Sequence, residues 1–155
     1  MIKIRTVRYR IGRSRIHGRG AFATCRIRKG TRIVEYTGQR VRAREAEKRG
    51  ALSDHVWLFD LQDGTFIDGD PASAGACVNH SCEPNCYTEI DGTQVFIMAD
   101  RTIDTGEELT YDYQFAPDHQ IHPCDCGADR CRGTINLPPG PRPRRSGKGA
   151  RQRKS

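Results

Sequence analysis

The sequence has no long hydrophobic run, and no stretch approaches the roughly 18–20 apolar residues that are needed to span a membrane. Residues 1–10 carry cations where a secretory signal peptide needs an apolar core, which disfavours export by that route. Apolar residues are sparse, at 35% of the 155 residues, whereas 16 glycines and 8 prolines indicate many turns. We therefore expect one turn-rich, intracellular domain without membrane contact.

Acidic residues are scarce at both ends of the chain, and cations are scarce in the middle. Residues 1–49 hold 16 Lys/Arg against three acids, residues 50–137 hold 16 Asp/Glu against three cations, and residues 138–155 hold seven cations and no acid. This division excludes a uniformly basic nucleic-acid coat, although the formal net charge is +7. The N-terminal cations lack interleaved aromatic residues, which favours a solvated strand face over a base-stacking surface.

The hydrophobic periodicity is mostly that of β-strands. Short alternating or β-branched segments predict strands at residues 9–11, 21–23, 31–36, 56–61, 65–67, 86–90, 94–99 and 109–115. Asp63-Gly64 and Asp91-Gly92 have the composition of hairpin turns. Residues 41–49 form the one helical stretch, with Glu45 and Arg49 spaced to pair. We expect a mostly β domain of small curled sheets.

The seven cysteines are an odd number and are unevenly spread. Three lie in Cys124-Asp125-Cys126-Gly127-Ala128-Asp129-Arg130-Cys131, and Cys77, Cys82 and Cys86 form a second group. Without an export signal, metal ligation explains them better than disulfides. Tetrahedral zinc needs four ligands, so the fourth must come from elsewhere, with Cys82 or Cys86 as the obvious donor. The alternative is that the three are ordinary buried thiols.

Two further segments are ambiguous when each is considered alone. Asn79-His80-Ser81-Cys82-Glu83-Pro84-Asn85-Cys86 is too polar for a core, but Asn, Ser and Pro also stabilise turns. Gly106-Glu107-Glu108-Leu109-Thr110-Tyr111-Asp112-Tyr113 places two tyrosines on one face of a strand, which is more often packing than catalysis.

Together, the segments are similar to a SET domain with a post-SET zinc loop. His17-Gly18-Arg19-Gly20, Glu35-Tyr36-Thr37-Gly38, Asn79 to Cys86, Glu107 to Tyr113 and Cys124 to Cys131 occur in that family's order and spacing. The resemblance is closest to the trithorax/mixed-lineage-leukaemia branch. It implies a SET domain over residues 5–116 and a post-SET zinc loop over 120–136, while composition predicts a disordered basic tail over 138–155. It also implies a C-terminal pseudoknot, in which the last strand threads a loop near Asn79.

The resemblance implies a protein-lysine methyltransferase that uses S-adenosylmethionine. Carried over by position, the cofactor-binding residues are His17, Gly18, Arg19, Gly20, Trp57, Asn79, His80 and Asp125. The catalytic residues are Tyr113, Tyr111 and Tyr36, and the substrate channel is lined by Phe59, Tyr36 and Tyr111. The zinc ligands are Cys82, Cys124, Cys126 and Cys131, which leaves Cys25, Cys77 and Cys86 as core thiols.

The chemistry places separate demands on these residues. Methyl transfer from a sulfonium requires a neutral amine, whereas free lysine has a pKa near ~10.4. A narrow aromatic channel lowers that pKa by desolvation, and alignment of donor and acceptor supplies most of the rate. Tyr113 would orient the amine. Tyr111 carries a hydroxyl that can hold a water where a further methyl would sit, which predicts a bias toward mono- or dimethylation.

One departure from the family stands beside the cofactor motif. The family usually places Arg-Phe-Ile before Asn-His-Ser, whereas this chain has Ala76-Cys77-Val78 and so lacks a guanidinium contact. The alternative function is therefore a catalytically weak SET-fold, zinc-containing binding module associated with chromatin or nucleic acid. The intact Asn79, His80 and Tyr113 favour the enzyme.

Charge and composition predict the partners. The acidic middle of the chain would steer a lysine-rich substrate, such as a histone or histone-like protein, to the site. The tail is expected to be disordered and to contact nucleic acid non-specifically, with a solubilising terminus or automethylation at Lys148 and Lys154 as alternatives. The expected location is the cytoplasm or nucleoid of a bacterium, the host nucleus for a secreted effector, and the chromosome otherwise.

Overall fold

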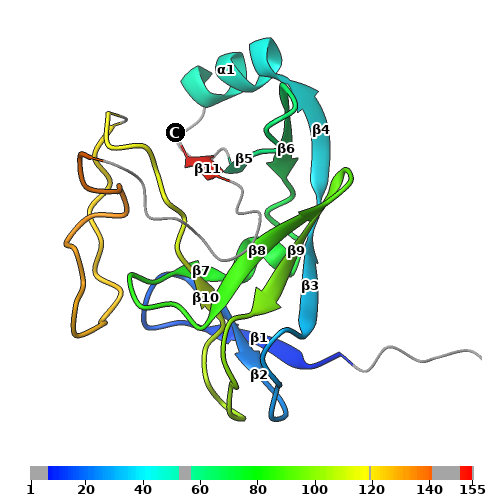
Figure 1. Cartoon of the computed structure of the whole chain (residues 1–155), viewed down its shortest axis with the longest axis vertical. Coiled ribbons are helices and arrows are strands. Elements are labelled where there is room, and N and C mark those ends of the chain that lie inside the picture. Colours follow the sequence, from blue (N-terminus) through cyan, green and yellow to red (C-terminus); the bar gives the residue numbers. More distant parts are fainter. Residues whose placement is uncertain (1–6, 53–56, 119, 141–150, 155) are drawn as a thin grey trace, which may run out of the picture.

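The computed structural model describes residues 7–52, 57–118, 120–140 and 151–154 (Figure 1). Its elements follow one another as β1 (Tyr9–Arg13), β2 (Arg19–Ala23), β3 (Arg32–Tyr36), β4 (Gly38–Arg42), α1 (Ala43–Leu52), β5 (Trp57–Asp60), β6 (Thr65–Gly69), the 3-10 turn η1 (Gly75–Cys77), β7 (Asn79–His80), β8 (Cys86–Asp91), β9 (Gln94–Ala99), β10 (Thr110–Tyr111) and β11 (Arg151–Lys154). The prediction of a mostly β fold is confirmed.

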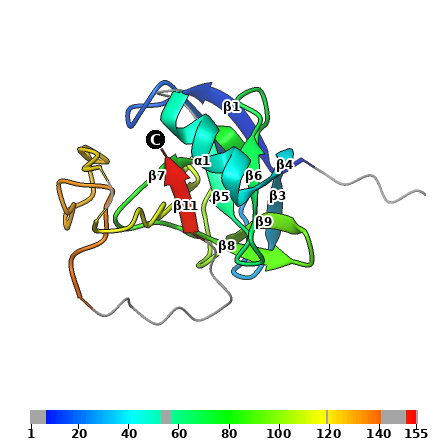
Figure 2. The same ribbon diagram turned by 90° about the horizontal axis from the view of Figure 1, so that it is seen from above.

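The strands form small separate sheets rather than one large sheet (Figures 1 and 2). The strand orders are β1-β2, β10-β7, β11-β5-β6-β4 and β3-β9-β8. Both predicted Asp-Gly hairpins are present, and Gly64 and Gly92 adopt the positive φ angles of 83° and 61° that such turns require. No helix among the described residues is long and apolar enough to cross a bilayer.

The predicted start of the helix is wrong by two residues. Val41 and Arg42 belong to β4, where they pair with Phe66 and Thr65 of β6, and the helix begins only at Ala43. The sequence pattern missed β4 because its partner lies far along the chain. Gly38 permits the pairing, since a Cβ at that position would overlap the carbonyl oxygen of Asp68.

The C-terminal segment also differs from the expected disorder. Residues 151–154 form β11, which pairs antiparallel with β5 (Figures 1 and 2). Strand pairing requires only backbone donors and acceptors, so a polar, cationic segment can complete an open sheet edge. Composition therefore excluded burial in a core but did not exclude strand formation. Residues 141–150 of the predicted tail lie outside the described residues.

Three clusters of buried side chains form the core. The largest contains Ile27, Val78, Ile97, Ile103, Leu109, Tyr111, Tyr113 and Phe115, with small residues of β2 packed among them. A second cluster joins Tyr36, Phe59, Leu61, Ile67 and Val95, and a third joins Val41, Ala46, Leu58 and Phe66 beneath α1. Trp57 packs against both of the first two clusters.

The C-terminal part of the SET-like segment lies beside the polar segment that begins at Asn79, as the expected pseudoknot requires. β10 pairs in parallel with β7, with Thr110 opposite Asn79 and Tyr111 opposite His80. Buried Asn85 fixes this arrangement, because its amide donates to the Glu108 carbonyl at 2.8 Å and accepts from the Thr110 N–H at 2.9 Å.

Candidate active site and metal centre

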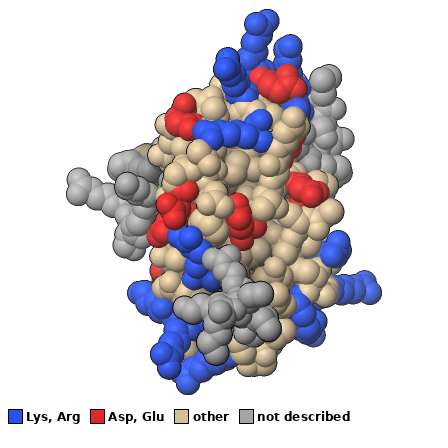
Figure 3. All heavy atoms as spheres, turned by 90° about the vertical axis from the view of Figure 1, so that its right-hand side faces the viewer, with Lys and Arg blue, Asp and Glu red and all other residues tan. Residues whose placement is uncertain are grey.

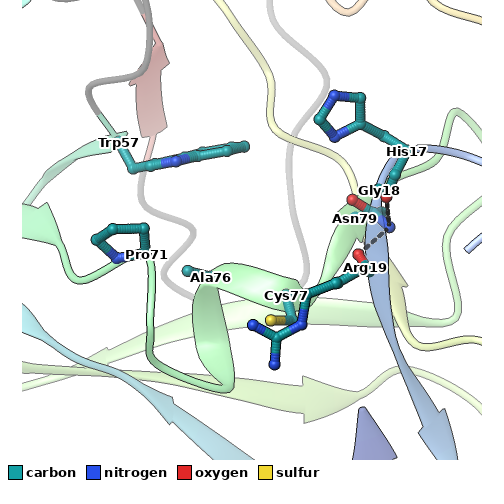
Figure 4. A pocket seen from close by; sticks show the side chains of 8 residues that line it. All are labelled: His17, Gly18, Arg19, Trp57, Pro71, Ala76, Cys77 and Asn79. Carbon is teal, nitrogen blue, oxygen red and sulfur yellow. Dashed lines mark hydrogen bonds between the residues drawn. The ribbon is translucent and has the colours of Figure 1, made fainter. Parts of the chain in front are cut away.

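A cavity of about 280 Å³ lies between the β1–β2 turn, the start of β5 and η1. It is lined by His17, Gly18, Arg19, Trp57, Pro71, Ala76, Cys77 and Asn79. Figure 4 shows Trp57 and Pro71 on one side, the His17–Arg19 turn with Asn79 on the other, and Ala76 with Cys77 between them. The cavity thus offers an aromatic wall opposite backbone polar groups.

Asn79 connects the cavity to the turn that borders it. Its buried side-chain amide donates to the carbonyl oxygens of His17, at 3.1 Å, and Arg19, at 2.9 Å (Figure 4). The same amide donates to Glu108 Oε1 at 2.9 Å, and that oxygen also accepts from the Ser14 hydroxyl at 2.7 Å. The amide suits this position because its two N–H groups can be shared among three oxygen acceptors.

Gly20 leaves room for the Glu108 side chain beside the cavity. A Cβ at Gly20 would overlap the Glu108 carboxylate, so glycine lets Glu108 approach the turn closely. Glu108 was part of a sequence motif but received no predicted role. Its function became visible only when the fold brought it to within hydrogen-bonding distance of Asn79 and Ser14.

A buried group of aromatic rings adjoins the cavity. The Trp57 and Tyr113 rings meet edge-on with centroids 5.9 Å apart, and the Tyr111 ring lies 4.8 Å from that of Tyr113. The Tyr113 hydroxyl donates to the Val78 carbonyl at 2.9 Å. Burial raises the pKa of Tyr113 well above its usual value, with Tyr36 adding to the effect, so the phenol stays protonated and remains a donor.

Tyr36 and Phe59 form the adjoining wall of the aromatic group. Their centroids are 5.5 Å apart, both side chains are fully buried, and the Tyr36 hydroxyl donates to the Trp57 carbonyl at 3.3 Å. Gly69 of β6 makes room, since a Cβ there would overlap the Tyr36 hydroxyl. The predicted catalytic and channel residues thus fall in two neighbouring core clusters, and Trp57 of the cavity wall packs against both.

The four predicted zinc ligands also come together. The Sγ atoms of Cys82, Cys124, Cys126 and Cys131 all lie within 4.8 Å of one another. The Cys82 and Cys124 sulfurs are 3.8 Å apart, close to the roughly 3.8 Å that tetrahedral geometry with Zn–S bonds of about 2.3 Å requires. A soft dication suits this all-sulfur set.

Electrostatics within the cluster supports the same donor set. Burial raises the pKa of Cys82 and of Cys124. At Cys126 burial acts in the same direction, but hydrogen bonds from the Cys82 and Ala128 N–H groups, together with those from the Cys131 and Cys124 thiols, outweigh it and lower the pKa to about 7. Four thiolates this close need a cation to offset their repulsion, which fits a metal that binds deprotonated thiols.

Two interactions join the cysteine loop to the aromatic region. Arg132 makes a bidentate ion pair with Asp112, with distances of 2.9 and 3.0 Å, directly before Tyr113 in the chain. His80 Nδ1 accepts the Tyr113 N–H at 3.1 Å, while its Nε2 lies 3.4 Å from Cys82 Sγ. This hydrogen bond leaves the proton of a neutral imidazole on Nε2, where it can donate to the ligand sulfur.

Comparison with known proteins decides the family. A family model described as "SET domain" matches residues 18–114, which is more than half of the chain. The chain belongs to the SET domain family. The sequence-based identification is thereby confirmed.

Similar proteins extend the match beyond the SET domain itself. The chain is 38% identical over 133 residues to "Histone-lysine N-methyltransferase trithorax" of Drosophila virilis, covering 80% of this chain and 4% of that protein. It is 38% identical to "Histone-lysine N-methyltransferase 2B" of Homo sapiens over 80% of this chain and 5% of the relative. It is 38% identical to "Histone-lysine N-methyltransferase, H3 lysine-4 specific" of Schizosaccharomyces pombe, over 87% of this chain and 16% of that protein. The chain thus spans a small part of these relatives.

Within the SET domain, the predicted cofactor residues divide into two groups. His17, Gly18, Arg19, Trp57 and Asn79 line the cavity. Gly20, His80 and Asp125 are not among its lining residues in the described part of the chain: Gly20 accommodates Glu108, His80 joins Tyr113 to the cysteine cluster, and Asp125 is exposed. Direct cofactor contact stays a prediction for all eight residues.

The remaining cysteines also divide. Cys86 lies in the core, where burial raises its pKa to about 12, and Cys25 is half-buried against the same cluster. Cys77 is buried as predicted, but it also lines the cavity, a role that the sequence argument did not assign. Cys77 is the last residue of the 3-10 turn η1, and no local sequence pattern predicted this turn.

The surface of the SET domain shows the uneven charge. On the face in Figure 3, lysines and arginines gather at the two ends, and acidic residues lie across the middle. The acids of the middle segment are partly neutralised by ion pairs such as Arg40–Asp63 and Arg49–Asp68.

Proposed function

We propose that this SET domain is an S-adenosylmethionine-dependent protein-lysine N-methyltransferase that modifies a lysine in a basic, histone-like protein. The observation that carries the proposal is the edge-on contact of Trp57 with Tyr113, at 5.9 Å between centroids. Trp57 lines the cavity and Tyr113 lies in the buried aromatic region, so one ring contact joins the proposed cofactor site to the residues proposed to receive the lysine.

The cavity has the groups that the cofactor needs. S-adenosylmethionine would supply an activated methyl group on a positively charged sulfur. The carbonyl groups of His17 and Arg19 are already held by Asn79, so the turn is set before a ligand binds. Trp57 offers a flat apolar surface, and its position across the cavity from Gly18 excludes water from one side of the bound molecule (Figure 4).

The aromatic region prepares the amine. Tyr36, Phe59, Tyr111 and Tyr113 are each at most 3% exposed, and such burial disfavours an ammonium ion. The amine therefore loses its proton to water before or as it enters. The Tyr113 hydroxyl donates to the Val78 carbonyl, so its oxygen can accept a hydrogen bond from an N–H of the neutral amine and orient the nitrogen.

The substrate class follows from charge and from the relatives. Residues 50–137 hold 16 acidic residues against three cations. This negative charge favours binding of a basic polypeptide. The relatives are named as histone-lysine methyltransferases, and we carry that class to this chain as a proposal. It would work beside chromosomal DNA, where such proteins are found, with the basic tail as a non-specific nucleic-acid contact.

Incubating the purified chain with labelled cofactor and histones tests the function. We expect wild-type protein to label the histone, and Tyr113→Phe to lose most of the activity, by about a hundredfold or more, because the orienting hydroxyl is gone. Tyr87→Phe is the matched control, since this half-buried tyrosine lies on β8.

Calorimetry separates catalysis from binding in the same variants. Tyr113→Phe should bind the cofactor as wild type does. If its affinity fell with its activity, Tyr113 would be a binding residue. If wild-type protein bound histone but never labelled it, the alternative of a zinc-containing binding module would replace the enzyme.

A further inference from the structure

Glu108 has a fixed place beside the turn that borders the cavity. Its backbone forms an antiparallel bridge with Phe22 of β2, and the next residue, Leu109, donates its N–H to the Ala21 carbonyl at 2.7 Å. The Asn85 amide also donates to the Glu108 carbonyl, at 2.8 Å. The Glu108 side chain therefore extends from a backbone that several interactions keep in position.

The carboxylate accepts hydrogen bonds from two parts of the site. Glu108 Oε1 accepts from the Ser14 hydroxyl at 2.7 Å and from the Asn79 amide at 2.9 Å. The Ser14 oxygen in turn accepts the N–H of Ile16 at 2.9 Å, which connects the carboxylate to the backbone of the β1–β2 turn. Gly20 gives the carboxylate room, since a Cβ there would overlap it. Glu108 thus joins Asn79 to the turn.

These bonds decide which end of the Asn79 amide faces the turn. Asn79 Nδ2 has three oxygen neighbours, which are Glu108 Oε1 and the carbonyls of His17 and Arg19. A flipped amide would bring Oδ1 against three acceptors that have no proton to offer. A hydrogen bond to a carboxylate is roughly twice as strong as one between neutral groups, so Glu108 contributes most to this orientation.

The oxygen end of the amide is left to the cavity. Asn79 lines the cavity, and Figure 4 shows its nitrogen bonded to the turn. No hydrogen bond to Asn79 Oδ1 occurs within the part of the chain that the structure describes. The cavity therefore offers an acceptor at this point. An acceptor backed by a carboxylate suits a cationic N–H donor, such as the ammonium group of an amino acid.

We propose that Glu108 is a positioning residue of the cofactor site, which holds the Asn79 amide with its oxygen toward the cavity. The inference rests on the proposed function, because the ammonium group belongs to the amino-acid part of S-adenosylmethionine. Glu108 is not among the described residues that line the cavity, so it acts through Asn79.

Calorimetry with S-adenosylmethionine separates this role from simple packing. Glu108→Met keeps the size of the side chain but removes the acceptor, and the dissociation constant should rise by about tenfold or more. Glu108→Gln keeps an acceptor oxygen and should stay within about threefold of wild type. Glu107→Met is the matched control, since Glu107 pairs with Arg101 instead, and it should bind the cofactor as wild type does.

Kinetics provides a second comparison. In Glu108→Met the KM for the cofactor should rise with the dissociation constant, whereas kcat at saturating cofactor should stay within about threefold of wild type. A general loss of folded protein would instead lower kcat and leave KM unchanged.

A double-mutant cycle tests whether Glu108 acts through Asn79. In the Asn79→Ala background, Glu108→Met should have almost no further effect on the dissociation constant, because the amide that it positions is absent. Independent, multiplying losses in the double variant would contradict action through Asn79.

A third readout needs neither cofactor nor turnover. The side-chain N–H signals of Asn79 are identified in NMR spectra by their absence in Asn79→Ala. In wild-type protein these protons are buried and hydrogen-bonded, so they should exchange slowly with water. Exchange should be faster in Glu108→Met and unchanged in Glu107→Met.

The outcomes separate this proposal from the proposed function. Wild-type cofactor affinity in Glu108→Met, or equal losses in Glu108→Met and Glu108→Gln, overturns the positioning role while the enzyme stands. The expected pattern of affinities without label on any histone supports the positioning role and contradicts the enzyme. If wild-type protein bound no S-adenosylmethionine, the cofactor site and the enzyme would be contradicted together.

Discussion

The Asn79 side chain hydrogen-bonds to several groups around the cavity. Its side-chain amide donates to two backbone carbonyls of the turn that borders the cavity and to the carboxylate of Glu108. It is 5% exposed, so water cannot replace these bonds if they are lost. The residue thereby sets the shape of the cofactor site rather than merely lining it.

Replacing this amide should weaken cofactor binding. In Asn79→Ala the His17 and Arg19 carbonyls lose their shared donor, at about 1–3 kcal/mol for each buried group left unpaired. We expect a dissociation constant for the cofactor about tenfold higher or more, measured by calorimetry. Asn136→Ala is the control, since this buried asparagine bonds Ala116 and Gln120 instead. An equal loss of affinity in both variants would reduce the effect to general destabilisation.

Tyr111 should set the number of methyl groups transferred. It is 2% exposed and its ring lies 4.8 Å from that of Tyr113, the residue that we propose orients the amine. Removing the hydroxyl in Tyr111→Phe frees the room of one water, and products should shift from mono- and dimethyl toward trimethyl lysine. Mass spectrometry of products compares it with wild type and Tyr87→Phe. Identical distributions would contradict this role.

At the scale of elements, the cysteine loop and the SET core act as one unit. Cys82 comes from the core, while the other three ligands come from the loop. Arg132 of the loop pairs with Asp112, and His80 lies between Tyr113 and the Cys82 sulfur. A metal held by these four cysteines would join the loop to the core and, through Cys82 and His80, would restrict the position of Tyr113.

Metal removal should therefore lower stability. We expect one zinc per chain by elemental analysis, with loss of zinc and a lower Tm in Cys82→Ser. Cys86→Ser is the matched control, because Cys86 is near in sequence but packs in the core, and it should retain zinc. Equal zinc contents in wild type and Cys82→Ser would contradict the ligand set.

What the sequence could predict depended on how local each signal was. The two Asp-Gly hairpins, which join β5 to β6 and β8 to β9, were predictable because each turn lies between its two strands in the sequence. β4 and β11 were not, since each takes its partner from a distant segment. The zinc ligands and aromatic residues were accessible through family resemblance. Glu108 and Cys77 were missed because only the folded chain brings them to Asn79 and the cavity.

At the scale of the whole molecule, charge is arranged in segments. The two basic ends together carry +20 and the acidic middle −13, which leaves the chain a formal +7. On the face in Figure 3, lysines and arginines are densest at the two ends of the molecule, and acidic residues lie mostly between them. Such separation steers a basic peptide to the middle while the ends remain attracted to polyanions.

Salt should therefore weaken substrate capture. Raising ionic strength screens exposed charges beyond a Debye length of about 10 Å at 0.1 M. We expect KM for a basic histone peptide to rise with added salt, whereas kcat stays nearly constant. A control peptide whose flanking lysines and arginines are replaced by glutamine should bind weakly and show little salt dependence. A salt-independent KM for the basic peptide would contradict steering by charge.

The most direct test of the account is mass spectrometry of a histone peptide after incubation with the purified chain, zinc and S-adenosylmethionine. The account predicts a peptide lysine heavier by one or two methyl groups with wild-type and Tyr87→Phe protein, and an unmodified peptide with Tyr113→Phe. An unmodified peptide with zinc-loaded, cofactor-bound wild-type protein, or equal methylation by Tyr113→Phe, would contradict it.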